Sequence, residues 1–181
     1  LYTDSFQAIL PLPPKDFSRI SEEIDLLPSS HRTLIFTMVQ CQHFAYPGMG
    51  QILLKQHCYH QSIRIGDRIE VSGQGGWDTE TGEVSKDVKT QIDQIFKNID
   101  LALKDAGGKG WSQVYRITAY YIPETQHEDL MHMCNNIKKW IPGKEPLLTC
   151  VGVAKLTMEG MFMEIEVAAH DEEGGEAARK D

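Results

Sequence analysis

Residues 61–74 read QSIRIGDRIEVSGQ, and this stretch decides the first part of the fold. Two arms rich in β-branched residues flank the pair Gly66-Asp67. Glycine and aspartate both tolerate the positive φ angles that a two-residue hairpin turn requires. The stretch therefore predicts a β-hairpin with its turn at Gly66 and Asp67.

An apolar stripe at helical spacing follows the hairpin. Its members recur mostly at steps of three and four residues: Val88, Ile92, Ile95, Phe96, Ile99, Leu103 and Ala106. This spacing puts them on one face of an α-helix. Ser85 is the predicted N-cap, Asp87 suits the first turn, and Gly107-Gly108 predicts the end of the helix.

The rest of the middle region predicts strand, helix, strand and strand. Residues 114–122 are rich in β-branched and aromatic residues, which is typical of a strand. Thr125 and Glu128 match a capping box that begins a second helix. The apolar positions of that helix are Leu130, Met133, Cys134, Ile137 and Ile141. Residues 147–156 and 161–169 predict the last two strands.

The last predicted strand has two different faces. Met163, Ile165 and Val167 alternate with the carboxylates Glu164 and Glu166. The order of elements indicates an α+β fold, in which a mixed β-sheet carries two helices on one face. The other face of such a sheet also needs cover, and oligomerisation would supply it.

The ends of the chain differ from its middle. Residues 1–42 hold several prolines and no persistent periodicity, so we expect a poorly ordered extension. Residues 43–170 form the predicted domain, and residues 171–181 an acidic flexible tail. The net charge is −8, of which the two ends contribute −2 and −3, leaving −3 for the middle. This balance argues against a nucleic-acid-binding surface.

Composition restricts the class further. The chain has no apolar run near the roughly 20 residues that span a bilayer, so we expect no membrane association. Four cysteines occur without a C-x-x-C pair, which favours a reduced intracellular protein. We therefore expect a cytoplasmic location, with a mitochondrial one as the alternative.

Short motifs follow one another along the middle region in a characteristic order. They are Tyr59-x-Gln61, Val71-Ser72-Gly73-Gln74, Thr81-Gly82-Glu83, Asp105-Ala106-Gly107, Pro146-x-x-Thr149-Cys150-Val151 and Glu164-Ile165-Glu166. In this series the chain resembles the Rid family (YjgF-type, reactive-intermediate deaminase), also known as the L-PSP endoribonuclease family. The resemblance covers nearly all of residues 44–170 and does not extend to residues 1–42.

The resemblance implies a chorismate-mutase-like fold, assembled as a homotrimer with small-molecule clefts between subunits. Characterised members hydrolyse enamines and imines to ammonia and a 2-keto acid, without metal or cofactor. The implied activity is that of a 2-iminobutanoate/2-iminopropanoate deaminase-like hydrolase. Two alternatives stay open: a non-catalytic small-molecule-binding homologue, and an endoribonuclease or translation inhibitor, as some members have been described.

The implied site residues follow from the motifs. Glu164 matches the glutamate that positions the attacking water, while Tyr59, Gly73 and Cys150 match residues of the substrate-binding cleft. Leu148 departs from the pattern, because deaminase members carry there an arginine that grips the substrate carboxylate. We expect an altered substrate preference as a result.

Another cation is one way to replace the missing arginine. The candidates are Arg64, Arg68 and Arg116, each on or beside a predicted strand. The alternative is a less acidic ligand, for which the apolar Leu148 is suitable.

Two other chemistries have little support in the sequence. No His-Asp or His-Asn arrangement can be placed beside Cys150, so we expect an inert thiol. Residues 57–60 (HCYH) contain two histidines and a cysteine, but no second cluster completes a four-ligand set. We therefore predict neither a metal site nor a cofactor.

Overall fold

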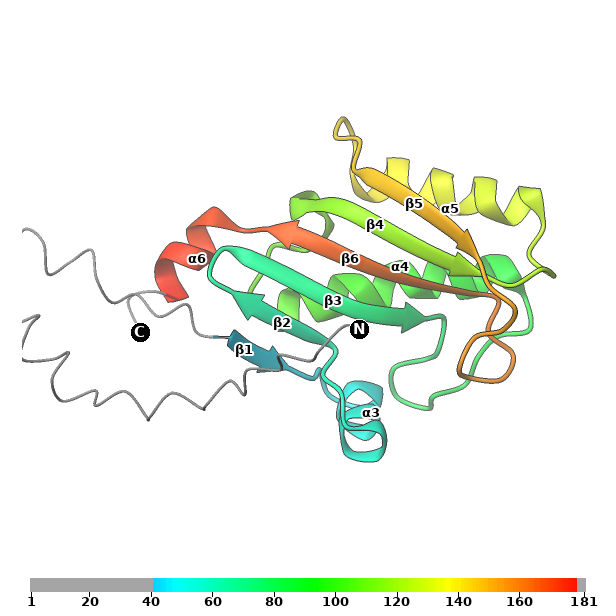
Figure 1. The fold of residues 1–181 in the computed structure, drawn as a ribbon, viewed down its shortest axis with the longest axis horizontal. Coiled ribbons are helices and arrows are strands. Elements are labelled where there is room, and N and C mark those ends of the chain that lie inside the picture. Colours follow the sequence, from blue (N-terminus) through cyan, green and yellow to red (C-terminus); the bar gives the residue numbers. More distant parts are fainter. Residues whose placement is uncertain (1–40, 179–181) are drawn as a thin grey trace, which may run out of the picture. The chain divides into compact units, whose positions relative to one another are not determined.

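A computed structural model describes residues 41–178 of the chain, and the predicted extension up to residue 40 lies outside these residues. The described part contains one six-stranded sheet in the order β1-β2-β3-β6-β4-β5 (Figure 1). Its strands are β1 (Cys41–Phe44), β2 (Ser62–Ile65), β3 (Arg68–Gly75), β4 (Val114–Tyr121), β5 (Leu147–Gly152) and β6 (Met163–His170). The sheet is mixed, because β4 and β5 pair in parallel while all other neighbours pair antiparallel.

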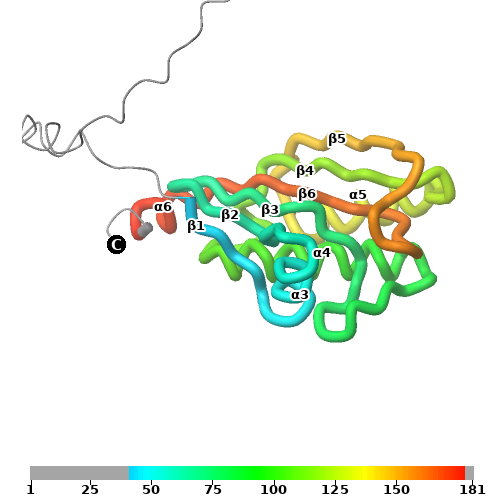
Figure 2. Tube along the Cα trace, turned by 60° about the horizontal axis from the view of Figure 1, so that its bottom comes forward, coloured from blue at the N-terminus to red at the C-terminus, as the bar shows by residue number. Residues whose placement is uncertain are grey.

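Two long helices lie on the same face of this sheet. Figures 1 and 2 show α4 (Val88–Asp105) and α5 (His127–Trp140) side by side on that face. The shorter helices α3 (Met49–His57) and α6 (Glu172–Ala178) lie near the ends of the strands. Within residues 41–178 no helix covers the opposite face, which we call the open face. The predicted α+β arrangement, a mixed sheet with two helices on one face, is confirmed.

The core lies between α4 and the sheet. The apolar stripe of α4 is fully buried from Ile92 to Leu103, and Phe96 stacks on Trp111 with ring centroids 4.6 Å apart. Ile117 of β4 and Ile165 of β6 meet this stripe from the sheet and are likewise fully buried. Each large side chain buried in this way contributes about 1.5–3 kcal/mol relative to leaving it exposed.

The predicted hairpin is also present and is anchored at its turn. Gly66 has a φ angle of +61°, and Ile65 pairs with Arg68 across the turn. The Arg64 side chain points inward, where its Nε donates to the carbonyl of Ala106 at 2.9 Å. Its guanidinium also contacts Asp171 Oδ2 at 2.7 Å, and both side chains are buried. This buried ion pair ties β2 to the end of β6.

The two helix starts differ from the predicted ones by one or two residues. Asp87, not Ser85, is the N-cap of α4, since its carboxylate accepts a hydrogen bond from Thr90 N at 2.8 Å. The stronger charged acceptor takes the capping position. The second capping box is formed by Gln126 and Asp129, not by Thr125 and Glu128. The Thr125 hydroxyl instead donates to the Phe162 carbonyl at 3.0 Å.

Several boundaries also differ. The sheet begins at Cys41, two residues before the predicted domain. The last two strands are shorter than predicted, because β5 ends at Gly152 and β6 begins at Met163. Helix α3 was not predicted, although Met49, Ile52 and Leu53 have helical spacing.

The acidic segment after β6 is helical where the sequence predicted a flexible tail. Helix α6 begins at Glu172, and Asp171 Oδ1 accepts a hydrogen bond from Gly174 N at 3.2 Å. Gly175 packs directly on the backbone of Asp67, where an added Cβ would overlap. The glycines that suggested flexibility therefore permit close packing of α6 on the hairpin turn.

Candidate functional site

The centre of the candidate site is a β-bulge in β3. Val71 pairs with Val167 and Gln74 with Ile165, so β3 contains one residue more than β6 between these pairs. The bulge consists of Ser72 and Gly73. The side-chain amide of Gln74 donates to the Ser72 carbonyl at 3.1 Å and holds the bulge from inside. A bulge changes the direction in which its residues point. Here it brings the Gly73 backbone toward the neighbouring strand β6.

A buried polar network lies behind the bulge. Tyr46 OH donates to Gln74 Oε1 at 2.9 Å, and Trp77 Nε1 donates to Tyr46 OH at 3.2 Å. The Gln74 amide also donates to Gln61 Oε1 at 3.0 Å. Burial raises the pKa of Tyr46 to about 12, so the phenol stays protonated as a donor. These bonds fix the indole of Trp77, which forms a wall of the site.

Glu164 lies directly over the bulge. An ideal Cβ built on Gly73 would overlap Glu164 Oε1, so only glycine leaves room for this carboxylate. Glu164 is half-buried. Burial raises the pKa of its carboxyl above the ordinary value, and the nearby charge of Glu166 raises it further. A carboxylate with a raised pKa accepts a proton more readily than an exposed glutamate does.

A cavity of about 410 Å³ opens beside Glu164. It brings together three of the predicted site residues, Tyr59, Gly73 and Glu164. Burial raises the pKa of the Tyr59 hydroxyl, and the charge of Glu164 adds to the shift, so the phenol remains a hydrogen-bond donor. The cavity thus combines a hydrogen-bond donor, Tyr59, with a proton acceptor, Glu164.

Most of the other cavity residues were not predicted. Its apolar wall consists of Leu53, Trp77, Met158 and Met161. The exposed His57, at the end of α3, also lines it. No single-sequence signal marks these residues, since they come from α3 and from two loops that meet only in the folded chain.

The other two predicted residues, Leu148 and Cys150, lie elsewhere in the single chain. They pair with Ile117 and Ala119, so their side chains are on the side of the sheet that α5 covers. Leu148 lines a separate groove of about 260 Å³ beside Ile137 of α5 and Ile141, the residue that follows this helix. One chain therefore does not bring Leu148 and Glu164 into the same cavity.

Cys150 lies on the exposed edge strand β5. Partial burial of its thiol raises the pKa, and the nearby Cys134 adds to the shift. A raised thiol pKa lowers the thiolate fraction, which agrees with the expectation of an inert thiol.

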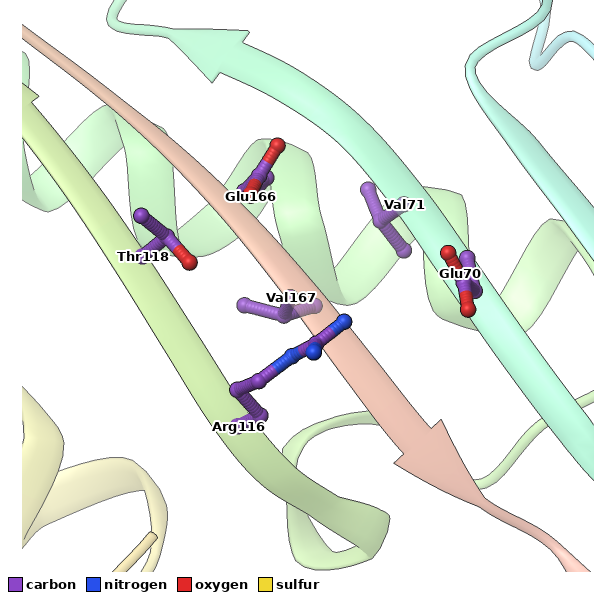
Figure 3. Close-up of a pocket in the computed structure, with 6 residues that line it drawn as sticks. All are labelled: Glu70, Val71, Arg116, Thr118, Glu166 and Val167. Atoms are coloured by element: carbon purple, nitrogen blue, oxygen red, sulfur yellow. The ribbon is translucent and has the colours of Figure 1, made fainter. Parts of the chain in front are cut away.

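The three candidate arginines all lie away from the cavity. Arg64 is buried in its ion pair with Asp171, and Arg68 pairs with Glu70 at 2.6 Å. Arg116 extends from β4 across β6 on the open face, in a polar groove that also contains Glu70 and Glu166 (Figure 3). Within residues 41–178, none of the three lines the cavity beside Glu164.

Two other features of the described residues concern metals and membranes. Between residues 41 and 178, no three side chains of His, Cys, Asp or Glu converge as metal ligands would. In the same part of the chain, no helix has the length and apolar character to cross a membrane.

Comparison with known proteins identifies the family. The family model described as endoribonuclease L-PSP matches residues 50–171. The chain is 34% identical over 125 residues to the RutC family protein YjgH of Escherichia coli, covering 68% of this chain and 91% of the relative. It is 32% identical over 111 residues to a RutC family protein of Aquifex aeolicus, covering 61% of this chain and 86% of the relative.

Solved structures agree with the sequence relatives. The structure of the protein YjgH matches with a TM-score of 0.61 and 32% identity, over 73% of this chain and 96% of that chain. RidA from the Antarctic bacterium Psychrobacter sp. matches with a TM-score of 0.56 and 28% identity, over 62% of this chain and 87% of that chain. The chain therefore belongs to the Rid or YjgF family, whose family model is described as endoribonuclease L-PSP.

Proposed function

We propose that this protein is an intracellular hydrolase of reactive imines or enamines, acting as a homotrimer with clefts between its subunits. The observation that carries the proposal is the position of Glu164. This half-buried carboxyl of raised pKa lies over Gly73 and faces the same cavity as Tyr59. Family membership and the relation to a protein named RidA add support.

The chemistry needs little beyond positioning. Glu164 accepts a proton from water while the water oxygen bonds to the imine carbon, which gives a carbinolamine. The proton then passes to the nitrogen, the carbon–nitrogen bond breaks, and ammonia leaves as the hydroxyl proton passes to Glu164 and the carbonyl forms. Tyr59 donates a hydrogen bond that orients the ligand. Because imines are already reactive, holding the reactants together supplies much of the acceleration.

The proposed trimer explains the separation of the two groups of site residues. Every residue of β5 is exposed in the single chain, including the apolar Leu147, Leu148 and Val151. An uncovered edge strand with apolar side chains is suited to pairing or packing with another chain. In the proposed assembly, Leu148 and Cys150 of one subunit complete the cavity that contains Glu164 of its neighbour.

A second candidate function is ligand binding without turnover. Leu148 favours it, because this leucine stands where deaminase members bind the substrate carboxylate. The two candidates differ in whether bound ligand is converted. RNA cleavage has less support, since the middle region has a net charge of −3 and no lysine or arginine is found among the described residues that line the cavity.

The test is hydrolysis of imines generated in situ. An oxidase produces the imine from an amine or amino acid, and the carbonyl product is followed with and without the purified protein. We expect acceleration over buffer, and a loss of about 100-fold or more in Glu164→Gln, because a general base contributes about 10²–10⁴. Glu159→Gln is the matched control, since Glu159 is exposed in the loop before β6 and does not line the cavity.

The outcomes separate the candidates. Saturable ligand binding without any acceleration, for imines of several side chains, would favour the binding protein. Equal losses in Glu164→Gln and Glu159→Gln would remove Glu164 from the mechanism.

A further inference from the structure

The cavity beside Glu164 has a largely apolar wall, and the described residues that line it include no lysine or arginine. Trp77, Met158, Met161 and Leu53 supply the wall, and the volume of about 410 Å³ is within the range of small-molecule sites. Of the residues between 41 and 178 that line the cavity, Glu164 is the one with a carboxylate. Among the described residues, the only basic side chain that lines the cavity is His57, which is exposed at its rim.

The candidate arginines do not supply a positive charge to the cavity. Arg64 is held inside the domain by Asp171 and by the Ala106 carbonyl, at 2.7 and 2.9 Å. Arg116 lies over β6 beside Glu166, in a groove on the open face that shares no residue with the cavity (Figure 3). A carboxylate bound in the cavity would meet the charge of Glu164, and no guanidinium among the described residues that line the cavity offsets this charge.

The lining of the cavity suits a ligand that is apolar and positively charged better than one that carries a carboxylate. Trp77 presents an aromatic surface and the two methionines present polarisable thioethers, which pack well against an apolar or aromatic group. Glu164 attracts a cation. A protonated imine with an apolar substituent matches both features, because its charge lies at the carbon–nitrogen bond where the water is delivered.

On the basis of the proposed hydrolase function, we infer that the substrates are iminium ions of apolar amines that lack a carboxylate. The reaction is R₂C=NH₂⁺ + H₂O → R₂C=O + NH₄⁺. Water forms the new carbon–oxygen bond, the carbon–nitrogen bond breaks, and both protons of the water end on nitrogen. Trp77, Met158 and Met161 determine the specificity for the apolar group, and the leucine at position 148 tolerates a substrate without an anion.

The test compares two imines that share a benzyl group. Oxidation of 2-phenylethylamine by an amine oxidase gives the imine without a carboxylate, and oxidation of phenylalanine by an amino-acid oxidase gives the imino acid. Trapping with semicarbazide reports how much imine escapes hydrolysis. We expect kcat/KM to be at least about tenfold higher for the carboxylate-free imine, the size of one missing charge-assisted contact.

Two variants check the cause of the preference. Leu148→Arg is expected to shift the preference toward the imino acid, whereas Leu148→Met, which keeps the size and adds no charge, is expected to leave it unchanged. His57→Gln is expected to retain the preference for the carboxylate-free imine. A wild-type protein that hydrolyses the imino acid as fast or faster would overturn the inference while leaving the hydrolase function intact.

Binding separates failure of the inference from failure of the proposed function. If neither imine is hydrolysed, the hydrolase proposal fails, and calorimetry with 2-phenylethylamine and with phenylpyruvate still tests the ligand class. Tighter binding of the ammonium ligand would support the inferred class. Equal or tighter binding of phenylpyruvate would overturn it.

Discussion

The centre and the edge of the sheet are built differently. At the centre, β3 and β6 are covered by α4, and the bulge at Gly73 is fixed by the buried bonds of Gln74 and Tyr46. At the edge, every residue of β5 is exposed, and Leu147 has 69% of its surface exposed. The single chain therefore positions Glu164 in its cavity, whereas Leu148 and Cys150 lie on the exposed strand β5, apart from that cavity.

This difference indicates that the position of Leu148 in the proposed site depends on assembly, whereas the position of Glu164 does not. The position of Glu164 follows from packing inside one domain, so it should persist in a monomer. The environment of Leu148 follows from whatever covers β5. Variants at the centre should change the chemistry without changing the oligomer, and variants at the edge should change the oligomer first.

The largest effect is expected at Gly73. In Gly73→Ala the new methyl group overlaps Glu164 Oε1, so the carboxylate must leave its position. We expect turnover to fall by about 100-fold, the range of a lost general base, with the oligomer unchanged. Steady-state kinetics and size-exclusion chromatography measure the two properties. Gly152→Ala is the control on β5, because its Cβ would meet only Tyr121 at ordinary contact distance, 3.8 Å.

A substitution of Leu147 tests whether the edge strand β5 takes part in the proposed assembly. Leu147→Lys puts a charge on the most exposed large apolar side chain among the described residues. Burying an unpaired charge costs about 3 kcal/mol or more, so we expect trimer association to weaken by at least about 100-fold. Sedimentation velocity measures the mass, and far-ultraviolet circular dichroism checks that each chain stays folded.

Met131→Lys serves as the matched control for Leu147→Lys. Met131 is 44% exposed on α5, and we expect its replacement to leave the assembly intact. A Leu147→Lys protein that remains a trimer with normal turnover would contradict the proposed position of β5 at the interface.

Features that depend on local sequence were predicted, whereas features that depend on tertiary contacts were not. The hairpin turn at Gly66, the stripe of α4 and the alternation in β6 depend on local periodicity, and all three are confirmed. The N-cap of α4 was misplaced because Ser85 and Asp87 each accept a hydrogen bond from a backbone amide, and only the Asp87 carboxylate accepts from the first turn of the helix, at Thr90 N, whereas Ser85 accepts from Asp87 N. Helix α6 was missed because the fit of Gly175 onto Asp67 is a tertiary contact.

The candidate site likewise contains residues that motifs predict and residues that only the folded chain brings together. Tyr59, Gly73 and Glu164 were predicted through motifs, and the fold brings them to one cavity. Trp77, Met158 and Met161 come from segments whose meeting point is fixed by the β3 bulge and the loop before β6, which no local pattern reveals. The roles of Leu148 and Cys150 remain predictions, because they depend on the proposed assembly.

Glu164 offers a test of the centre through stability. Its raised pKa means that the folded chain binds this proton more tightly than the unfolded chain. Ionisation therefore destabilises the fold as pH rises from the ordinary glutamate pKa through the raised one. We expect Glu164→Gln to be more stable than the wild type at neutral pH, with a difference that disappears below about pH 4, where both states are protonated. Urea unfolding at several pH values measures this difference, and a less stable variant at neutral pH would contradict the burial of the charge.

The smallest expected effect concerns Glu166, which raises the pKa of Glu164 by its charge and also accepts a hydrogen bond from Tyr120 at 3.3 Å. Glu166→Gln removes the charge but keeps an acceptor for Tyr120. Because the Glu164 pKa then falls, the acidic limb of the kcat/KM profile should move to lower pH while the plateau rate is retained. Glu70→Gln removes a carboxylate from β3 in the same polar groove (Figure 3), and we expect its profile to match the wild type. Equal shifts in both variants would mean that the overall charge of the open face, rather than Glu166 alone, sets the pKa of Glu164. The pKa of Glu164 would then depend on more of the sheet than its immediate neighbours at the centre.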